Sequence, residues 1–434
     1  MESLMRTQNA EGGTRNEESG LVTSRLPRRG FLAAAGLAWL TPLGTRLARA
    51  AEEDHGPAKS VIVLWMGGGP SQLETFDPKP GTNIAAGTRA INTAVRGVQL
   101  AAGLEQLADQ MGHVGLVRSL VSLEGDHERG TYLLKTGYRP DPTVVHPSIG
   151  AIVCHDFPDA GVDIPRHVSI LPGQWPARGG MLGAEYDAFK VHDPAKKVPD
   201  VTPTVPADRF DTRLKDLDVV EGAFAKGRGQ AGATGHRDTM DRARRLMSSE
   251  QLRAFDVSRE SASIRKEYGE TPFGRGCLAA RRLLEVGARC VEVTLDGWDS
   301  HANNHQIHSR LVGVLDPAFA ALLRDLKTRD MLRHTVVLCV GEFGRTPIVN
   351  ALGGRDHWPH TFSAAIAGGR IRGGVVVGES DPAGGKQPKE PVPVANLHAT
   401  VFKALGIDWE KTLKTPIRRT IRRSEGTPIK ELLS

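Results

Sequence analysis

Short apolar runs that end in glycine or in polar residues recur along the chain and predict buried β-strands. The first run, Val61 to Trp65, passes into three consecutive glycines, which is typical of a buried strand followed by a tight turn. Further runs of this kind predict strands within residues 113–121, 162–171, 289–295 and 335–340. Together these five runs predict a sheet.

Between the last two predicted strands, apolar residues recur at helical spacing. They are Leu311, Leu315, Phe319, Leu322 and Leu326. A strand, a helix and a strand in that order favour a right-handed crossover and a mostly parallel sheet. The expected fold class is therefore α/β.

The middle of the chain has a different pattern. Residues 214–268 are polar and helix-forming, and a loop rich in Pro, Lys and Asp precedes them. We interpret about 190–270 as a helical insertion that caps the sheet. Residues 379–394 form a second predicted surface loop, before a helix at 395–407 and a basic tail. No internal repeat is visible.

The first 50 residues have the parts of an export signal. Arg28-Arg29 precede an apolar stretch at 31–43, which Thr41-Pro42 interrupts, and Ala48-Arg49-Ala50 resembles a cleavage site. The stretch is shorter than the roughly 20 apolar residues that span a bilayer. The arrangement is similar to the twin-arginine signal, although Pro27 stands where that pattern prefers Ser or Thr. We expect a mature domain at 51–434 that is periplasmic or extracellular and meets the membrane only during export.

Composition and charge exclude some classes. Hydrophobic residues are 39% and charged residues 24%, so the chain can bury a core. Of the net charge of +6, half lies in residues 1–50 (seven Arg, four Glu), and residues 51–434 carry 49 Lys and Arg against 46 Asp and Glu. This weak charge, without basic runs interleaved with aromatics, predicts no nucleic-acid partner.

The four cysteines are far apart and none forms a C-x-x-C motif. A zinc ribbon or a thioredoxin-like site is therefore not expected. Most of them should be small buried residues. A Cys277–Cys290 bridge remains open for an oxidising compartment.

Carboxylate and histidine side chains, which bind metals in other proteins, follow two of the predicted strands and occur again in the loop after the second of them. In open parallel sheets, ligand sites gather at the carboxyl ends of strands. Carboxylates and imidazoles there could hold one or two metal ions, or could only cap turns and helices. The candidates are Asp296, Asp299 and His301 after 289–295, Glu342 after 335–340, and Asp356, His357 and His360 in the loop beyond.

Two further features could bind an anion. The glycine-rich turn Gly67 to Ser71 could form a backbone nest for an anion, or simply a turn. Arg345 follows Glu342 closely and could hold an anionic substrate group through two hydrogen bonds, or form a surface salt bridge.

Six motifs in order resemble the bacterial family named domain of unknown function 1501, over nearly the whole mature chain. They are GGGPSQLETFDPKP, HERGTYLLKTG, HPSIGAIV, GWDSHANN, GEFGRTP and GRDHWP. The family looks like a branch of the alkaline phosphatase and sulfatase superfamily. The resemblance implies a doubly wound, mostly parallel sheet flanked by helices, and a metal-assisted hydrolytic site.

The chain departs from the sulfatase pattern at the nucleophile. His127 stands where sulfatases have the cysteine that becomes formylglycine, and Glu342-Phe343 replaces their second ligand pair. The resemblance then leaves a rearranged metal site, with His127 as acid or base and Thr131 or a metal-activated water as the attacking group. The rearranged ligand set is Asp299, His301, Glu342, Asp356 and His357.

The leading hypothesis is an exported metal-dependent hydrolase that acts on sulfate or phosphate esters. Its cofactor would be a divalent ion such as zinc, manganese or calcium. Its partner would be a sulfated or phosphorylated small molecule or polysaccharide. Two alternatives remain: a non-catalytic binding protein for carbohydrate or a protein partner, and a site that binds only a structural calcium ion.

Overall fold

A computed structural model describes residues 58–157, 161–196, 198, 201–202, 205–228 and 242–434. The predicted export signal and its cleavage site lie outside these residues. Within them, every helix is too short or too polar to cross a bilayer.

The described chain is built on one nine-stranded sheet in the order β12-β4-β11-β8-β1-β7-β5-β6, with β13 paired beside β4. Only β11 runs antiparallel to its neighbours, so the sheet is mixed and mostly parallel, as expected. The strands are β1 (Ser60–Gly67), β4 (Val114–Val121), β5 (His167–Ile170), β6 (Phe189–Val191), β7 (Cys290–Asp296), β8 (Thr335–Val340), β11 (Phe362–Ala367), β12 (Val376–Val377) and β13 (Val392–Pro393).

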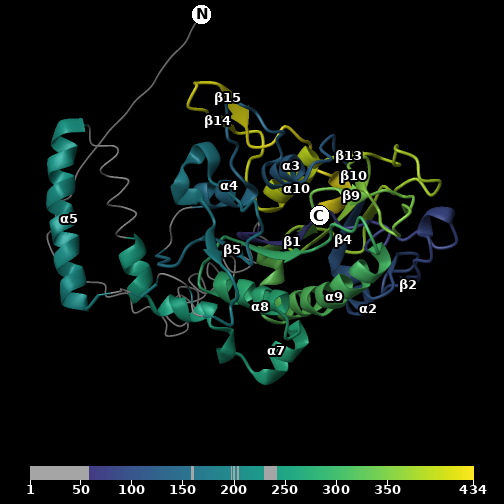
Figure 1. The fold of residues 1–434 in the computed structure, drawn as a ribbon, viewed down its shortest axis with the longest axis horizontal. Helices are drawn as coiled ribbons and strands as arrows, with labels where there is room; N and C mark the ends of the chain where they lie inside the picture. The colour runs from purple at the N-terminus through teal and green to yellow at the C-terminus, as the bar shows by residue number, and fades with distance from the viewer. Residues whose placement is uncertain (1–57, 158–160, 197, 199–200, 203–204, 229–241) are drawn as a thin grey trace, which may run out of the picture. The chain divides into compact units, whose positions relative to one another are not determined.

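Helices cover both faces of this sheet (Figure 1). On one face lie α2 (Glu105–Asp109), α7 (Ala262–Tyr268), α8 (Pro272–Glu285) and α9 (Asn304–Thr328). On the other lie α3 (His127–Thr136), α4 (Ile149–Asp156) and α10 (Val394–Ala404). The predicted class, a helix-flanked and mostly parallel α/β sheet, is confirmed.

Strand β1 shows how the sequence produces two cores. Its side chains alternate between the faces, as the period of a strand requires. Ile62 and Leu64 pack with α8 and α9, whereas Val61 and Trp65 pack with α4 and α10. Because both faces are buried, the strand reads as a continuous apolar run.

All five predicted strands are present, as β1, β4, β5, β7 and β8. The helix expected after β7 is also present as α9, and it continues through Pro317. The sequence reasoning missed β11, whose residues Phe362–Ala367 are all buried. It also missed the short edge strand β6.

The middle segment contains helices, among them α5 (Ala207–Arg228), whose described side chains are mostly exposed. All four cysteines are free and buried. The bridge left open between Cys277 and Cys290 is therefore absent: burial keeps both as thiols and raises their pKa values well above the ordinary range.

Three small antiparallel pairs complete the described chain. They are β2 (Ala90–Asn92) with β3 (Gln99–Ala101), β9 (Gly344–Arg345) with β10 (His357–Trp358), and β14 (Thr412–Lys414) with β15 (Thr420–Arg422). The β9–β10 pair lies between β8 and β11 in sequence and sets Arg345 opposite His357.

Candidate metal centre

Three histidines and one aspartate meet at the carboxyl edge of the sheet. Asp299 follows β7 by three residues, and His301 comes two residues later. His127 is the first residue of α3, which follows β4, and His357 lies in β10 before β11. Strands β4, β7 and β8 run in one direction, so their ends bring these distant segments together.

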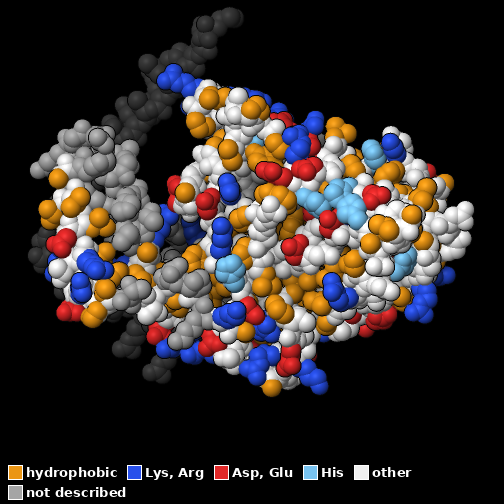
Figure 2. Space-filling view, in the orientation of Figure 1, with side chains coloured by type: hydrophobic (Ala, Val, Ile, Leu, Met, Phe, Trp, Pro, Cys, Tyr) orange, Lys and Arg blue, Asp and Glu red, His pale blue; other side chains and the backbone are white. Residues whose placement is uncertain are grey.

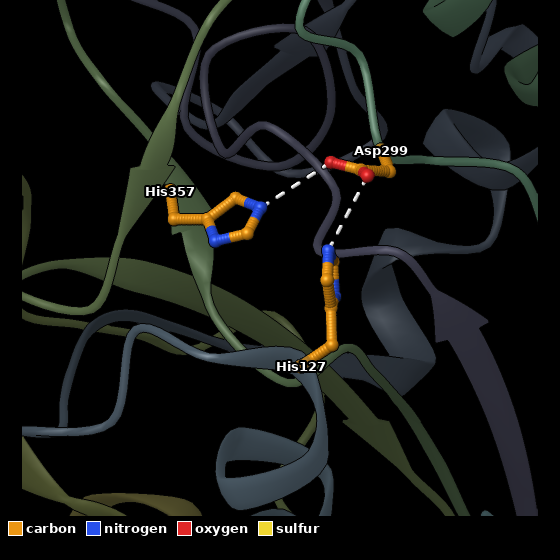
Figure 3. A group of neighbouring side chains, drawn as sticks. All are labelled: His127, Asp299 and His357. Carbon is orange, nitrogen blue, oxygen red and sulfur yellow. Dashed lines mark hydrogen bonds and ion pairs between the residues drawn. The ribbon is translucent and has the colours of Figure 1, made fainter. Parts of the chain in front are cut away.

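Asp299 is the centre of the cluster (Figure 3). Its Oδ2 lies 3.4 Å from Nε2 of His127, and its Oδ1 lies 3.3 Å from Nε2 of His357. Nε2 of His301 is 3.0 Å from the same Oδ1 and 3.1 Å from Nε2 of His357. All three imidazoles therefore present the same nitrogen to one carboxylate.

The other nitrogen of each ring faces an acceptor. Nδ1 of His127 lies 2.8 Å from Oε1 of Glu342, and Nδ1 of His301 lies 2.8 Å from Oδ1 of Asp356. Nδ1 of His357 donates to the carbonyl oxygen of Gly125 at 2.7 Å. A backbone carbonyl can only accept, so Nδ1 of His357 carries a proton.

This arrangement fixes the tautomer of His357 and is compatible with the same tautomer in His127 and His301. A neutral histidine with a proton on Nδ1 has a bare lone pair on Nε2. The Nε2 atoms of His301 and His357 are 3.1 Å apart and would repel each other without a cation or a shared proton between them. Histidines that bind metals in proteins donate their second N–H to a carboxylate or carbonyl in this way.

The distances and charges fit a divalent cation. Ligands about 2.0–2.1 Å from a tetrahedral zinc ion lie about 3.3 Å from one another. The separations of 3.0 to 3.4 Å that join Asp299 to each histidine, and His301 to His357, are of this size, and the ligand atoms of His127, Asp299 and His357 all lie within 4.8 Å of one another. Apart from the rings, three carboxylates (Asp299, Glu342 and Asp356) and one guanidinium (Arg345) give the cluster a net charge of −2.

The cluster is open to solvent. The side chains of His301 and Asp299 are 47% and 43% exposed, whereas Glu342 behind them is buried. Figure 2 shows histidine side chains gathered on this face of the molecule. A ligand could therefore approach from the His301 side.

Tight packing behind the cluster holds its two sides together. Phe343 is fully buried, and its ring lies 4.5 Å from that of His357 and 5.1 Å from that of His127. A side chain at Gly130 in α3 would come within 3.1 Å of Phe343, so glycine lets α3 approach the end of β8. At Gly68, φ is +109°, and a Cβ would lie 2.5 Å from the backbone nitrogen of Asp299.

Electrostatics keep Asp299 ionised and act in opposite directions on His127 and His357. Burial alone would raise the pKa of Asp299, but the hydrogen bond and charge of Arg345, together with His127, hold it below its ordinary value. The hydrogen bond to Glu342 raises the pKa of His127 against the effect of burial. Burial lowers the pKa of His357.

Glu342 and Asp356, expected as direct ligands, lie behind the histidines instead. Each carboxylate binds the Nδ1 side of a ring rather than the side that faces Asp299. Glu342 also accepts the backbone N–H of Gly68 at 2.9 Å. They are placed to orient His127 and His301.

Arg345 is fully buried and does not face solvent. Its guanidinium donates to Asp299 at 2.6 Å and to the carbonyl oxygens of Gly68, Gly69 and Arg355. The expected contact with an anionic substrate group is therefore not available to this side chain. Its donors are used to hold Asp299 and the glycine turn, which is a positioning role.

Three other candidates lie apart from the cluster. Thr131 is buried in α3, and among the described residues no hydrogen bond joins it to the cluster. The carboxylate of Asp296 is exposed and accepts the N–H of Gly297. His360 packs against the ring of Trp358.

The glycine turn binds a carboxylate of the protein itself. The N–H of Gly68 is donated to Glu342, and the N–H of Ser71 is donated to His308 at 2.8 Å. Two of the amides that an external anion would use are thus already paired, which favours the interpretation as a structural turn.

Sequence reasoning missed several residues that support the centre. The carbonyl of Gly125 could not be identified, because any residue carries one. Asn350 donates to the carbonyl of His301 and to Asp356, and accepts from two backbone amides of its own loop. The asparagine in a loop rich in Gly and Pro was the available signal for a structured turn.

Comparisons with solved structures find remote likenesses. The PsFucS1 sulfatase from Pseudoalteromonas sp. is 13% identical, with 83% of this chain and 70% of that one covered and a TM-score of 0.39. The phosphonate monoester hydrolase SpPMH from Silicibacter pomeroyi is 10% identical (86% and 76% covered, TM-score 0.38). A protein in the alkaline phosphatase superfamily from Vibrio parahaemolyticus is 9% identical (88% and 71% covered, TM-score 0.36).

At this level of similarity these likenesses do not bear on function. A comparison with curated protein sequences gives no significant match. The family profile described as "Protein of unknown function (DUF1501)" matches residues 58–433, and the family expected from the six motifs is thereby confirmed. The chain belongs to the DUF1501 family.

Proposed function

We propose that the protein is an exported, metal-dependent hydrolase of sulfate or phosphate esters. The observation that carries the proposal is the common orientation of the three imidazoles. Each has its Nδ1 on a fixed acceptor, and each turns Nε2 toward Asp299. Three imidazole nitrogens directed at one partly exposed carboxylate form a donor set that suits a metal ion.

His127, Asp299, His301 and His357 would hold the ion. The ligand atoms of His127, Asp299 and His357 all lie within 4.8 Å of one another, and His301 joins them through Asp299 and His357. Three imidazoles with one carboxylate suit zinc, and manganese is the next candidate. A bound ion would supply Lewis acidity toward an ester oxygen and toward water.

Three neighbouring residues would orient the ligands and balance the charge of Asp299. Glu342 and Asp356 fix the rings of His127 and His301, and Arg345 holds Asp299 in place. Within the described residues, no hydroxyl or thiol side chain is hydrogen-bonded to the four ligands. Attack by water, rather than by Thr131, therefore fits the placement better.

One observation favours the second candidate, a non-catalytic binding protein. The position that matches the sulfatase nucleophile holds His127, and both ring nitrogens of this residue already face carboxylates. A chain that kept the centre but lost the nucleophile could bind an anionic ester without cleaving it. Hydrolysis of small esters separates the two candidates.

Export and location are part of the proposal. The twin-arginine pattern at Arg28-Arg29 precedes the folded domain in sequence. A domain that acquires its metal ion before export would benefit from a route that carries folded proteins.

The first experiment measures the metal content of the mature protein, purified without chelators, for the wild type and for His301→Ala. His305→Ala is the matched control, because His305 lies four residues away and contacts Thr88 and Glu74 instead of the cluster. We expect about one metal ion per chain in the wild type and the control, and a large loss in His301→Ala. Equal metal content in all three, or none in the wild type, would contradict the centre.

The second experiment measures release of 4-nitrophenol from its sulfate and phosphate esters by the metal-loaded protein. Turnover that disappears on chelation and returns with the ion supports the hydrolase. Full metal occupancy without turnover of any ester would favour the binding protein.

A further inference from the structure

The β14–β15 hairpin is a strongly basic surface. Residues 411–422 contain five basic residues and no acidic one. Leu413 and Ile421 of this hairpin are buried, so the hairpin is anchored through one face. Its basic residues are all exposed: Lys411, Lys414, Arg418, Arg419 and Arg422.

Most of this charge is not neutralised. Within the described residues, Lys411, Lys414 and Arg418 form no ion pair, whereas Arg419 reaches Asp141 at 3.3 Å and Arg422 is 4.0 Å from Glu410. Arg418 has φ of +63°, a conformation that residues other than glycine rarely adopt. The turn therefore presents a concentration of positive charge to solvent.

Helix α3 connects this hairpin to the metal centre. His127 begins the helix, and Tyr138, just beyond its C-cap Gly137, donates its hydroxyl to the carbonyl oxygen of Arg422 at 2.6 Å. Ten helical residues span about 15 Å. The hairpin thus begins about one short helix away from the cluster.

Two further arginines lie along this path. Arg129 and Arg139 are both about half exposed, and both pair with the single buried carboxylate of Glu124. The exposed carboxylates of Asp126 and Glu128 flank His127 and offset this charge, so the positive excess of the surface comes from the hairpin itself. Figure 2 shows basic side chains, with acidic ones among them, between the histidines and the upper edge, where Figure 1 places β14 and β15.

We propose that the β14–β15 hairpin and the arginines beside α3 form a docking site for an extended sulfated polysaccharide, one of whose ester groups would reach the metal centre. This inference rests on the proposed function for its ester chemistry, but the docking itself does not require catalysis. A repeating polyanion fits the arrangement because its charges can meet several separated cations at once. A small ester would meet only the centre.

The composition of the hairpin argues against a nucleic acid. Residues 411–422 contain no aromatic side chain on which bases could stack, and the two aromatic rings beside them are already engaged: Tyr138 stacks on His146, and Trp409 faces the ammonium of Lys403. The large apolar side chain that the hairpin exposes is that of Ile417, at the turn, and it is aliphatic. Sulfate groups on a sugar chain need cations, which the hairpin supplies, and no stacking platform.

The test measures binding of fluorescein-labelled dextran sulfate to the full mature protein by anisotropy, over a range of salt concentrations. The variant Lys411→Gln, Lys414→Gln, Arg418→Gln removes the three unpaired charges at exposed positions. The control Arg96→Gln, Lys190→Gln, Lys266→Gln removes three exposed charges elsewhere on the domain. Neutral dextran of equal length is the ligand control.

We expect the hairpin variant to bind dextran sulfate at least tenfold more weakly, with a salt slope smaller by about two to three, roughly one per lost contact. The control variant should bind as the wild type does, and neutral dextran should not bind. Equal losses in both variants, or no loss in the hairpin variant, would overturn the docking site. Affinity for duplex DNA equal to that for dextran sulfate would overturn the assignment to a polysaccharide.

Hydrolysis separates this inference from the proposed function. Suppose that the hairpin variant loses dextran sulfate binding, and that neither the wild type nor this variant cleaves 4-nitrophenyl sulfate or phosphate. The docking site is then supported and the proposed hydrolysis is wrong. If both proteins cleave the small esters equally but bind dextran sulfate equally well, hydrolysis stands and the docking site is wrong.

Discussion

Two groups of histidines in this molecule have the same side chain and opposite surroundings. In the centre, His127, His301 and His357 have one nitrogen on an acceptor and the other turned to Asp299. In the interior, His308 lies in α9 and His398 in α10, on opposite faces of the sheet, and both are buried. Their hydrogen bonds are to backbone groups.

The surroundings determine what each group can do. Burial lowers the pKa of His308 and that of His398 to about 4, so both are neutral packing residues near neutral pH. In the centre, His127 and His301 each lie between two carboxylates, and His357 lies between Asp299 and the carbonyl of Gly125. A histidine is thus no evidence for a metal site by itself, whereas the group that its second nitrogen faces is.

The largest expected effect is loss of the metal ion in Asp299→Asn. This change keeps the shape of the side chain but removes the charge that all three imidazoles face. We expect metal affinity to fall by more than about 100-fold, above the 10- to 100-fold typical of residues behind the ligands. Competition with a chromophoric chelator measures it.

The control for that change is Asp296→Asn, at an exposed carboxylate three residues earlier that is not bonded to the cluster. Unchanged metal affinity in Asp299→Asn would remove the distinction between the two groups of histidines. An equal loss in both variants would show a general effect of negative charge at the end of β7.

The reverse effect is expected for His398→Ala, which should lose stability and keep the metal ion. The ring packs against the end of α3, where a Cβ at Gly137 would approach it to 3.0 Å, and it donates to the carbonyl of Leu134. A cavity and an unpaired carbonyl cost about 3 kcal/mol in the free energy of unfolding. Urea denaturation tests the loss of stability, and metal analysis of the same sample tests whether the ion is kept.

A smaller effect is expected for Asp356→Ala. Asp356 holds the Nδ1 side of His301 without facing the centre, so its loss should weaken metal affinity by about tenfold. Asp109→Ala, at an exposed residue that ends α2, is the control. A loss as large as that of Asp299→Asn would instead place Asp356 among the direct ligands.

The sequence predicted the sheet because β1 and β8 are nearly continuous apolar runs followed by glycine, and β7 has an apolar residue at every second position before Asp296. It did not predict β11, because FSAAIA is rich in alanine and its strand character comes from its neighbours β4 and β8. Strand propensity depends on the packing around a segment, which a single sequence does not show.

The candidate site was predicted in part. Asp299, His301 and His357 follow strand ends and could be placed by topology alone. His127 lies 172 residues before Asp299, and only the family resemblance singled it out. The division between ligands and supporting carboxylates could not be predicted, because it depends on which ring nitrogen each acceptor faces.

The smallest effect concerns pH. The folded-state pKa of His398 is about 4, below its ordinary value of about 6.5, so between these values the unfolded chain binds the extra proton. Stability is therefore fully present above about pH 6.5 and is lost as the pH falls toward 4. For one such residue, the loss between about pH 6.5 and 5.5 is on the order of 1 kcal/mol.

His398→Gln keeps a donor for the carbonyl of Leu134 but cannot titrate, so in metal-free protein it should remove the contribution of His398 to this slope and leave that of His308. His192→Gln, at an exposed position, should leave it unchanged. Urea denaturation in EDTA at several pH values measures both slopes. If the unfolding free energy of His398→Gln changed with pH as steeply as that of the wild type, His398 would not stay neutral when buried. The contrast between the interior histidines and those of the centre would then fail.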